Sequence, residues 1–118
     1  MTAEQIVTEI YRHKFHYRDE KELQKGISIL LSQLGLEFYP EVPLSRLDRI
    51  DFLVADGIGI EVKINSPLTP VIRQLWRYSE CPEIQALILV TTRSKHMNLP
   101  VKMNGKPLYY VYLLYSVF

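Results

Sequence analysis

The sequence predicts an α/β fold in which helices flank a mixed β-sheet. Three patterns support this class: apolar residues at helical spacing before the first strands, a strand–turn–strand pattern at residues 49–64, and an apolar run at residues 86–92 that follows another amphipathic segment. A strand that is apolar throughout is covered on both faces, and reaching it from a helix indicates a parallel connection. The length of 118 residues fits a single domain spanning residues 1–118.

The central pattern is a hairpin at residues 49–64, where two apolar runs flank a three-residue turn signal, Ala55-Asp56-Gly57. We expect a type I turn with Gly57 in the left-handed conformation. This loop length places Asp51 directly opposite Glu61, whereas a two-residue loop would put them on opposite faces. The even-numbered apolar residues are expected to share one buried face. They are Ile50, Phe52, Val54, Ile58, Ile60, Val62 and Ile64.

The other face of this hairpin carries Asp51, Glu61 and Lys63. Two carboxylates directly opposed across a strand pair repel each other unless something compensates their charge. A divalent cation would do so, and oxygen ligands suit magnesium or manganese. The alternative is an ordinary amphipathic hairpin with a solvated charged face. The hairpin alone does not decide between the two.

Two helices are predicted before the hairpin. The first, over residues 3–15, starts with a capping box formed by Thr2 and Gln5. It runs into a basic segment interleaved with aromatic residues at positions 12–18, which is either a phosphate-contacting patch or a solvated helix end. Within that segment, His13 and His16 are expected to lie at the surface.

The second helix is expected over residues 20–34, with Asp19 as its N-cap and Glu22 completing an Asp-x-x-Glu capping box. Glu20 lies at the edge of the apolar stripe of this helix. It is therefore the carboxylate best placed to approach the hairpin acids, and Gln24 lies one turn further along on the same side. Alone, Glu20 would be explained as a first-turn acid that the helix dipole favours.

Between this helix and the hairpin, residues 38–44 form a short strand that Pro40 and Pro43 restrict to an edge or an irregular course. Asp48 follows in the turn before the hairpin. It is a fallback metal ligand, ranked below Asp51.

A third helix follows the hairpin, with Thr69 as its cap and Pro70 at its first position. It places Gln74 and Tyr78 one turn apart on one side. Its packing residues are expected to be Ile72, Leu75, Trp76 and Ser79. Beyond the buried strand at residues 86–92, a polar loop with an Asn104-Gly105 turn leads to a last strand at residues 108–118, which is either buried or covered by a partner subunit.

Composition excludes some classes of function. A net charge of +1 gives no global signature of nucleic-acid binding, so any such affinity needs a local patch. The single cysteine, Cys81, cannot form an internal disulfide, which fits the cytoplasm. The longest uncharged stretch, residues 107–118, is too short to cross a membrane as a helix.

Taken together, these elements and motifs resemble the PD-(D/E)XK nuclease superfamily. The residues that carry the resemblance are Asp51, followed after nine residues by Glu61-Val62-Lys63, with Glu20 in the preceding helix. A Gln74-x-x-x-Tyr78 helix after the hairpin is similar to that of the RecB-type branch. Ile50 replaces the proline that names the motif, a departure that is frequent in the superfamily.

The resemblance implies a restriction-endonuclease-like fold, an αβββαβ core with a mixed sheet flanked by helices, here extended by one N-terminal helix. It implies that Asp51, Glu61 and the carbonyl of Val62 bind Mg²⁺ or Mn²⁺, with Glu20 completing the ligand shell. It further implies that Lys63 orients or polarises the attacking water. Gln74 and Tyr78 would support the site and contact the scissile strand.

The expected function is metal-dependent hydrolysis of DNA phosphodiester bonds that leaves a 5′-phosphate, with RNA as a further possible substrate. Without a DNA-reading module, the chain would recognise shape or ends, act as a homodimer, or be recruited by another protein. Two alternatives remain open. One is a dimeric endonuclease that cuts Holliday junctions, and the other is a non-catalytic nucleic-acid-binding or scaffold domain on the same fold.

Overall fold

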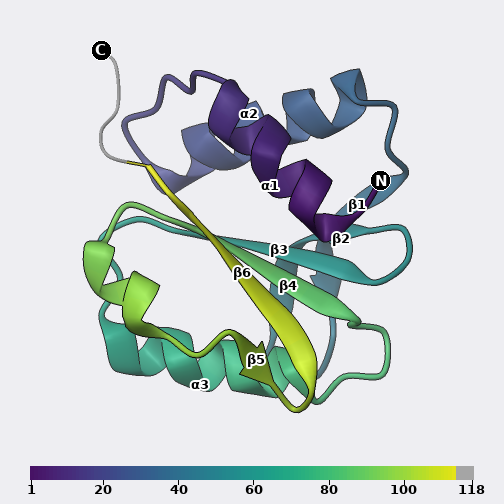
Figure 1. Ribbon diagram of the computed structural model, residues 1–118, viewed down its shortest axis with the longest axis vertical. Coiled ribbons are helices and arrows are strands. Elements are labelled where there is room, and N and C mark those ends of the chain that lie inside the picture. Colours follow the sequence, from purple (N-terminus) through teal and green to yellow (C-terminus); the bar gives the residue numbers. More distant parts are fainter. Residues whose placement is uncertain (114–118) are drawn as a thin grey trace.

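A six-stranded mixed sheet lies between two layers of helices in the computed structural model, which describes residues 1–113 (Figure 1). The strand order is β1-β2-β3-β4-β6-β5; β1, β2 and β3 pair antiparallel, β3, β4 and β6 pair parallel, and β5 pairs antiparallel with β6. The helices are α1 (Ala3–Arg12), α2 (Glu20–Gln33), α3 (Leu68–Ser79) and the short 3₁₀ helix η1 (Ser94–Asn98). The strands are β1 (Phe38–Pro43), β2 (Arg49–Val54), β3 (Ile58–Lys63), β4 (Ala86–Thr91), β5 (Lys102–Met103) and β6 (Lys106–Tyr112). The predicted α/β class with a mixed sheet flanked by helices is confirmed.

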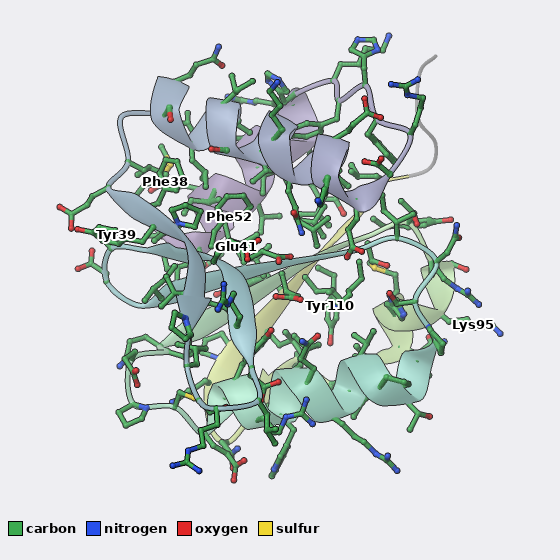
Figure 2. All side chains as sticks on the ribbon, turned by 180° about the vertical axis from the view of Figure 1, so that it is seen from behind. Phe38, Tyr39, Glu41, Phe52, Lys95 and Tyr110 are labelled. Carbon is green, nitrogen blue, oxygen red and sulfur yellow. The ribbon has the colours of Figure 1, made fainter. Side chains whose placement is uncertain are left out.

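Each face of the sheet has its own apolar core. Helices α1 and α2 cover one face, and α3 covers the other (Figure 1). On the α1/α2 side, Phe38 and Phe52 meet edge to face, with ring centroids 6.0 Å apart (Figure 2). Strand β4 is buried along its whole length, as its continuous apolar sequence predicts.

Helix α1 is shorter than predicted. Its capping box is present, because Thr2 and Gln5 each accept the other's backbone N–H, but the helix ends at Arg12. The chain then becomes extended at His13, which turns Phe15 into the core against Gly26 and buries Tyr17. The aromatic residues of the basic segment are therefore part of the core.

Helix α1 also ties the two ends of the described chain together. The Tyr11 hydroxyl accepts the backbone N–H of Tyr112 at 3.0 Å and donates to the carbonyl of Tyr110 at 3.5 Å. Ile6 and Ile10, on the inner side of the helix, are fully buried. Strand β6 thus lies inside the sheet and under α1, with Leu108 and Val111 buried and its other residues half-buried; residues 114–118 of the predicted last strand lie outside the described residues.

The turn between β2 and β3 has the predicted length and register but not the predicted type. Val54 pairs with Ile58 and Phe52 with Ile60, as a three-residue loop requires. Gly57 has φ +82°, but the preceding Asp56 also has a positive φ, +72°, and the Gly57 N–H donates to the carbonyl of Val54. A left-handed third residue in such a hydrogen-bonded turn is the mark of type II rather than type I.

We predict that Gly57→Ala destabilises the protein more than Gly35→Ala. Both glycines have positive φ values, so alanine costs about 1–2 kcal/mol at either position. A Cβ at Gly35 would meet open space, whereas at Gly57 it would clash with the backbone carbonyl of Glu83. Urea unfolding of the two variants measures the difference; equal free energies of unfolding would contradict the predicted clash.

Helix α3 begins two residues earlier than expected. Pro67 is the N-cap and the helix starts at Leu68, so Thr69 lies inside the first turn and caps nothing. Pro70 is tolerated there because the first N–H groups of a helix have no partner within it. The predicted packing was right for Leu75 and Ser79 and for the half-buried Ile72, which packs against the same core, but wrong for Trp76, which is 47% exposed. The helix packs instead through Val71, Leu75, Tyr78 and Ser79.

The segment after β4 is more ordered than a polar loop. His96 in η1 is fully buried, and its ring nitrogens lie 2.5 Å from the Thr91 hydroxyl and 2.9 Å from the carbonyl of Ser66. It thereby fastens the loop that leaves β3. Asn104 and Gly105 form the predicted turn, both with positive φ, between β5 and β6. None of the helices within residues 1–113 is both long and apolar enough to cross a membrane.

Candidate functional site

The candidate site lies where β2 and β3 separate. Their regular pairing extends only from Val54 to Phe52 on β2. At the next position, the Asp51 N–H donates to Glu61 Oε1 at 3.2 Å, and the Val62 N–H donates to Asp51 Oδ2 at 2.7 Å. Each carboxylate therefore takes the place of a backbone acceptor in the opposite strand, and the two acids stand in a gap in the sheet.

This gap corrects the predicted assignment of faces. Ile50 does not share a face with Phe52; it belongs to the core beneath α3, where it packs close to Gly59. Because Ile50 and Phe52 lie on opposite sides, the strict alternation of β2 breaks at Asp51. Asp51 consequently turns toward α2, whereas Glu61 turns toward α3. The two acids meet within the sheet and do not share one of its faces.

Glu61 is the most buried charged group of the site, with 3% of its surface exposed. Its Oε1 accepts from the Tyr78 hydroxyl at 3.1 Å, and its Oε2 lies 3.0 Å from Lys63 Nζ. Loss of solvation, followed by the charge of Asp51, raises the pKa of Glu61 to about 7, although Lys63 opposes the shift. Glu61 can therefore gain or lose a proton near neutral pH.

Tyr78 connects α3 to this gap. Its hydroxyl lies 3.0 Å from the carbonyl of Arg49 on β2 and 3.1 Å from Glu61 Oε1, and its side chain is fully buried. Burial and the neighbouring negative charge of Glu61 raise the pKa of Tyr78 far above its ordinary value. Tyr78 thus stays neutral, and it can donate its single hydroxyl proton to either the Arg49 carbonyl or Glu61, which lie on the two separated strands.

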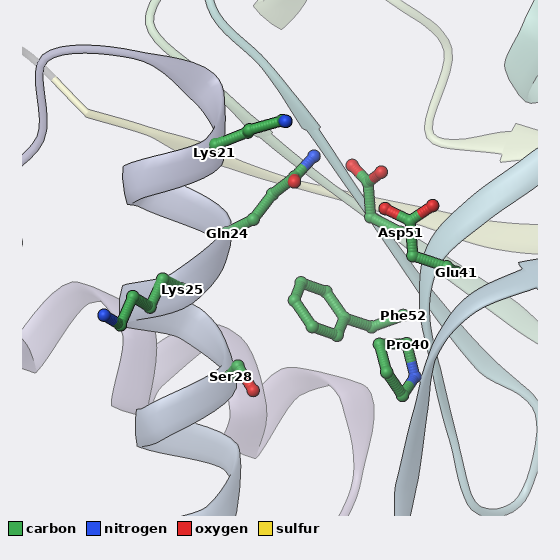
Figure 3. Close-up of a pocket in the computed structure, with 8 residues that line it drawn as sticks. All are labelled: Lys21, Gln24, Lys25, Ser28, Pro40, Glu41, Asp51 and Phe52. Carbon is green, nitrogen blue, oxygen red and sulfur yellow. The ribbon is translucent and has the colours of Figure 1, made fainter.

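Helix α2 brings two predicted residues to the other side of the gap. The half-buried Glu20 interacts with both Lys63 and Asp51; burial, followed by repulsion from Asp51, raises its pKa, and Lys63 opposes the rise. The Gln24 amide points at Asp51 (Figure 3). Burial raises the pKa of Asp51, whereas hydrogen bonds from Val62 and Gln24 lower it.

The Glu22 side chain points toward Arg18, away from the gap, whereas Glu20 faces it. Asp19 caps α2 by accepting the Glu22 N–H at 2.8 Å. The Glu22 carboxylate does not return to the cap, as a capping box would require; it accepts the backbone N–H of Arg18 at 2.8 Å and pairs with the Arg18 guanidinium. Of the two acids at the start of α2, Glu20 is the one that faces Asp51.

One acidic neighbour was missed from the sequence. Glu41 of β1 lies beside Asp51 (Figure 3), and its charge raises the pKa of Asp51. The pairing of Pro40 with Phe52 and of Val42 with Ile50 places it there. Pairing the segment at residues 38–44 with the hairpin would have revealed it, because Glu41 is the only acid in that segment.

A groove opens on each side of the gap, and both are at the small end of the range for ligand sites. The α2 groove, about 330 Å³, is lined by Lys21, Gln24, Lys25, Ser28, Pro40, Glu41, Asp51 and Phe52 (Figure 3). The α3 groove, about 290 Å³, is lined by Lys63, Ser66, Pro67, Pro70, Val71, Gln74 and Arg77. Asp51 thus opens to one groove and Lys63 to the other, with the predicted Gln74 beside Lys63.

Asp48 is held outside the gap. It is buried, and it forms a bidentate pair with Arg77, in which Nε and Nη2 lie 2.6 and 2.9 Å from its two oxygens. His13, on the α1 side, packs against the ring of Phe15 at 4.8 Å between centroids. The structure therefore places neither the fallback ligand nor this histidine with Asp51 and Glu61.

The two acids placed so that they could hold a metal are Asp51 and Glu61. Among residues 1–113, no three His, Cys, Asp or Glu side chains are grouped closely enough to hold a metal ion. Glu20 is within electrostatic reach but is not part of a preformed ligand group, and Val62 contributes its N–H to Asp51. The two central carboxylates are desolvated, mutually repelling and oxygen-bearing, which suits a hard cation.

Comparison with known proteins adds no relative: no family model, no curated protein and no solved structure matches the chain.

Proposed function

We propose that this chain is a metal-dependent nuclease of the restriction-endonuclease-like type that hydrolyses DNA phosphodiester bonds. The observation that carries the proposal is the buried Glu61, which meets Asp51, Lys63 and Tyr78 in the gap between β2 and β3. An acid with a pKa raised to about 7 beside a second desolvated acid is costly for folding. Such arrangements are concentrated at functional sites.

The order of elements also supports the proposal. A helix carrying Glu20, the meander β1-β2-β3, a helix carrying Tyr78 and a parallel strand β4 follow one another as the resemblance implies. Side chains from α2, β2, β3 and α3 surround one gap, although they are up to 58 positions apart, from Glu20 to Tyr78. A solvated charged hairpin face would need none of these contacts, so its burial favours a site over the ordinary amphipathic hairpin.

Asp51, Glu61 and the carbonyl of Val62 are the groups that would hold Mg²⁺ or Mn²⁺, with Glu20 contributing directly or through water. When bound, the metal supplies Lewis acidity and lowers the pKa of a coordinated water. The chain's own contribution is to keep Glu61 oriented through Tyr78 and Asp51 oriented through Gln24 and the Val62 N–H. Lys63, at the mouth of the α3 groove, would stabilise negative charge on the phosphate.

A non-catalytic binding domain is the second candidate, because both Glu61 oxygens already have partners within the protein. Cleavage assays separate the two. Supercoiled plasmid and labelled DNA, RNA and four-way-junction oligonucleotides are incubated with Mg²⁺, Mn²⁺ or EDTA. We expect cleavage with either metal and none with EDTA. Protein that binds these substrates but cuts none of them with any metal would leave only the binding function.

We also predict that Mg²⁺ or Mn²⁺ raises the melting temperature by several degrees at pH 8, because a ligand of the folded state stabilises it by mass action. The shift should shrink at pH 5.5, where Glu61, with its pKa of about 7, holds a proton that the metal must displace. Differential scanning fluorimetry measures both values. Asp51→Asn should abolish the shift, and an equal shift in this variant would place the metal elsewhere.

A further inference from the structure

The outer side of α3 carries an apolar surface next to the candidate site. Trp76 is 47% exposed and, with Ile72, Arg73 and Arg77, lines a shallow hollow of about 300 Å³. A large aromatic ring left half in water on a helix whose other side packs well has no role in the core. Its neighbours within the hollow are two cations and one aliphatic side chain.

Arg77 joins this hollow to the candidate site, since it lines both the hollow and the α3 groove that contains Lys63. The buried Asp48 fixes its orientation by taking Nε and Nη2 in a bidentate pair. The pair leaves Nη1 outside it, on a guanidinium whose side chain is 43% exposed. An arginine held in this way presents its remaining donors to a phosphate at little further entropic cost.

The residues that line the hollow suit an anionic ligand that also has flat aromatic rings free to stack. Arg73 supplies positive charge, and Arg77, whose charge Asp48 offsets, supplies hydrogen-bond donors; among residues 1–113, no acidic side chain lines the hollow with them. Trp76 supplies a flat ring on which a base can stack, an interaction worth about 1–3 kcal/mol per base that requires an unpaired base. Bases of an intact duplex are already stacked on each other and do not offer a face.

We propose that Trp76, Arg73 and Arg77 form a stacking site for single-stranded nucleic acid that continues from the α3 groove, with one base on Trp76 and the adjoining phosphates on the two arginines. The proposal rests on the proposed function in taking nucleic acid as the occupant of the α3 groove. It adds that the protein engages unpaired strands, such as overhangs or frayed ends.

Trp76 is the only tryptophan in the chain, so its fluorescence reports directly on this surface. The protein is titrated in EDTA with an oligothymidylate and, separately, with a blunt duplex. Stacking predicts quenching of Trp76 by the single strand. The duplex should produce little quenching.

Variants are then compared by fluorescence anisotropy of a labelled oligothymidylate. Trp76→Leu, which keeps an apolar side chain but removes the ring system, should weaken binding roughly 5- to 150-fold, the equivalent of one stacked base. Trp76→Phe should recover most of the affinity. Tyr39→Leu is the matched control, because Tyr39 is also an exposed aromatic residue, 55% exposed, on the outer edge of β1 (Figure 2).

Wild-type affinity for the oligothymidylate in Trp76→Leu, or the absence of quenching, overturns the proposal. These readouts need neither metal nor cleavage. Quenching and weakened Trp76→Leu binding in a protein that cuts no substrate would therefore support the stacking site while refuting the nuclease. Cleavage without quenching would support the nuclease and refute the stacking site.

Discussion

Replacing Lys63 with alanine is expected to lower the rate of DNA cleavage by about 10²- to 10³-fold, the usual loss when one charge-stabilising donor is removed from an active site. Lys63 is the cation nearest the central acids, with its Nζ 3.0 Å from Glu61 Oε2 and its side chain 19% exposed. Its substitution removes positive charge at the mouth of the α3 groove, where the phosphate is expected. The loss should therefore fall on turnover more than on binding of the substrate.

Single-turnover cleavage with saturating enzyme measures the chemical step, and anisotropy in EDTA measures binding. Lys95→Ala, which removes an exposed lysine of η1 away from the gap (Figure 2), serves as the matched control and should cleave at the wild-type rate. Circular dichroism at the assay temperature checks that both variants are folded. If Lys63→Ala cleaved as fast as Lys95→Ala, Lys63 would be only a salt-bridge partner of Glu61.

The second large effect is expected for a substitution of Glu61 that removes activity but increases stability. Glu61→Gln is expected to abolish cleavage and to stabilise the metal-free protein by about 2–3 kcal/mol at pH 8. The folded protein holds the Glu61 carboxyl at a pKa of about 7, against an ordinary value of 4.5. Ionising this group within the fold therefore costs about 3 kcal/mol relative to the unfolded chain. A neutral amide avoids that cost. Part of the gain is offset because the amide lacks the charge attraction that Glu61 has for Lys63.

The contribution of Glu61 to the free energy of unfolding depends on pH. Below about pH 4.5 the carboxyl is protonated in both states, so Glu61 does not penalise folding. Between pH 4.5 and 7 the unfolded chain releases the proton and the folded protein keeps it, so the contribution of Glu61 to the free energy of unfolding falls as pH rises. Above pH 7 the full penalty applies.

Urea denaturation in EDTA across this range, for the wild type and Glu61→Gln, isolates the contribution as the difference between the two curves. That difference should grow from near zero at pH 4 to its maximum at pH 8. Glu80→Gln, at an exposed position after α3, should run parallel to the wild type. A Glu61→Gln protein that is less stable than the wild type at pH 8 would show that the carboxylate is well compensated and not strained by burial.

Local patterns predicted the elements of this fold well. Helical spacing and the Asp19 cap placed α2 to within one residue, and the length of the turn at residues 55–57 fixed the pairing of Val54 with Ile58. These features depend on neighbours in the sequence. They are therefore readable without knowledge of the tertiary structure.

The details of the site were less predictable because they depend on contacts between distant segments. The break in alternation at Asp51 depends on the Val62 N–H and on Tyr78, which holds the carbonyl of Arg49 from another layer. A strict two-residue period therefore put Ile50 on the wrong face. Trp76 was assigned to the packing side of the amphipathic helix, whereas the folded protein leaves it 47% exposed.

The two hydrogen bonds between the Tyr11 hydroxyl and strand β6 have a consequence for how the chain folds during translation. They join Tyr11 to residues about 100 positions later, so they cannot form until β6 has been made. At about 5–20 residues per second, synthesis of roughly 100 intervening residues takes about 5–20 s. Throughout this time the apolar side of α1, with Ile6 and Ile10, lacks the strand that covers it. Nascent chains should accordingly engage chaperones through α1, and release should coincide with the arrival of β6.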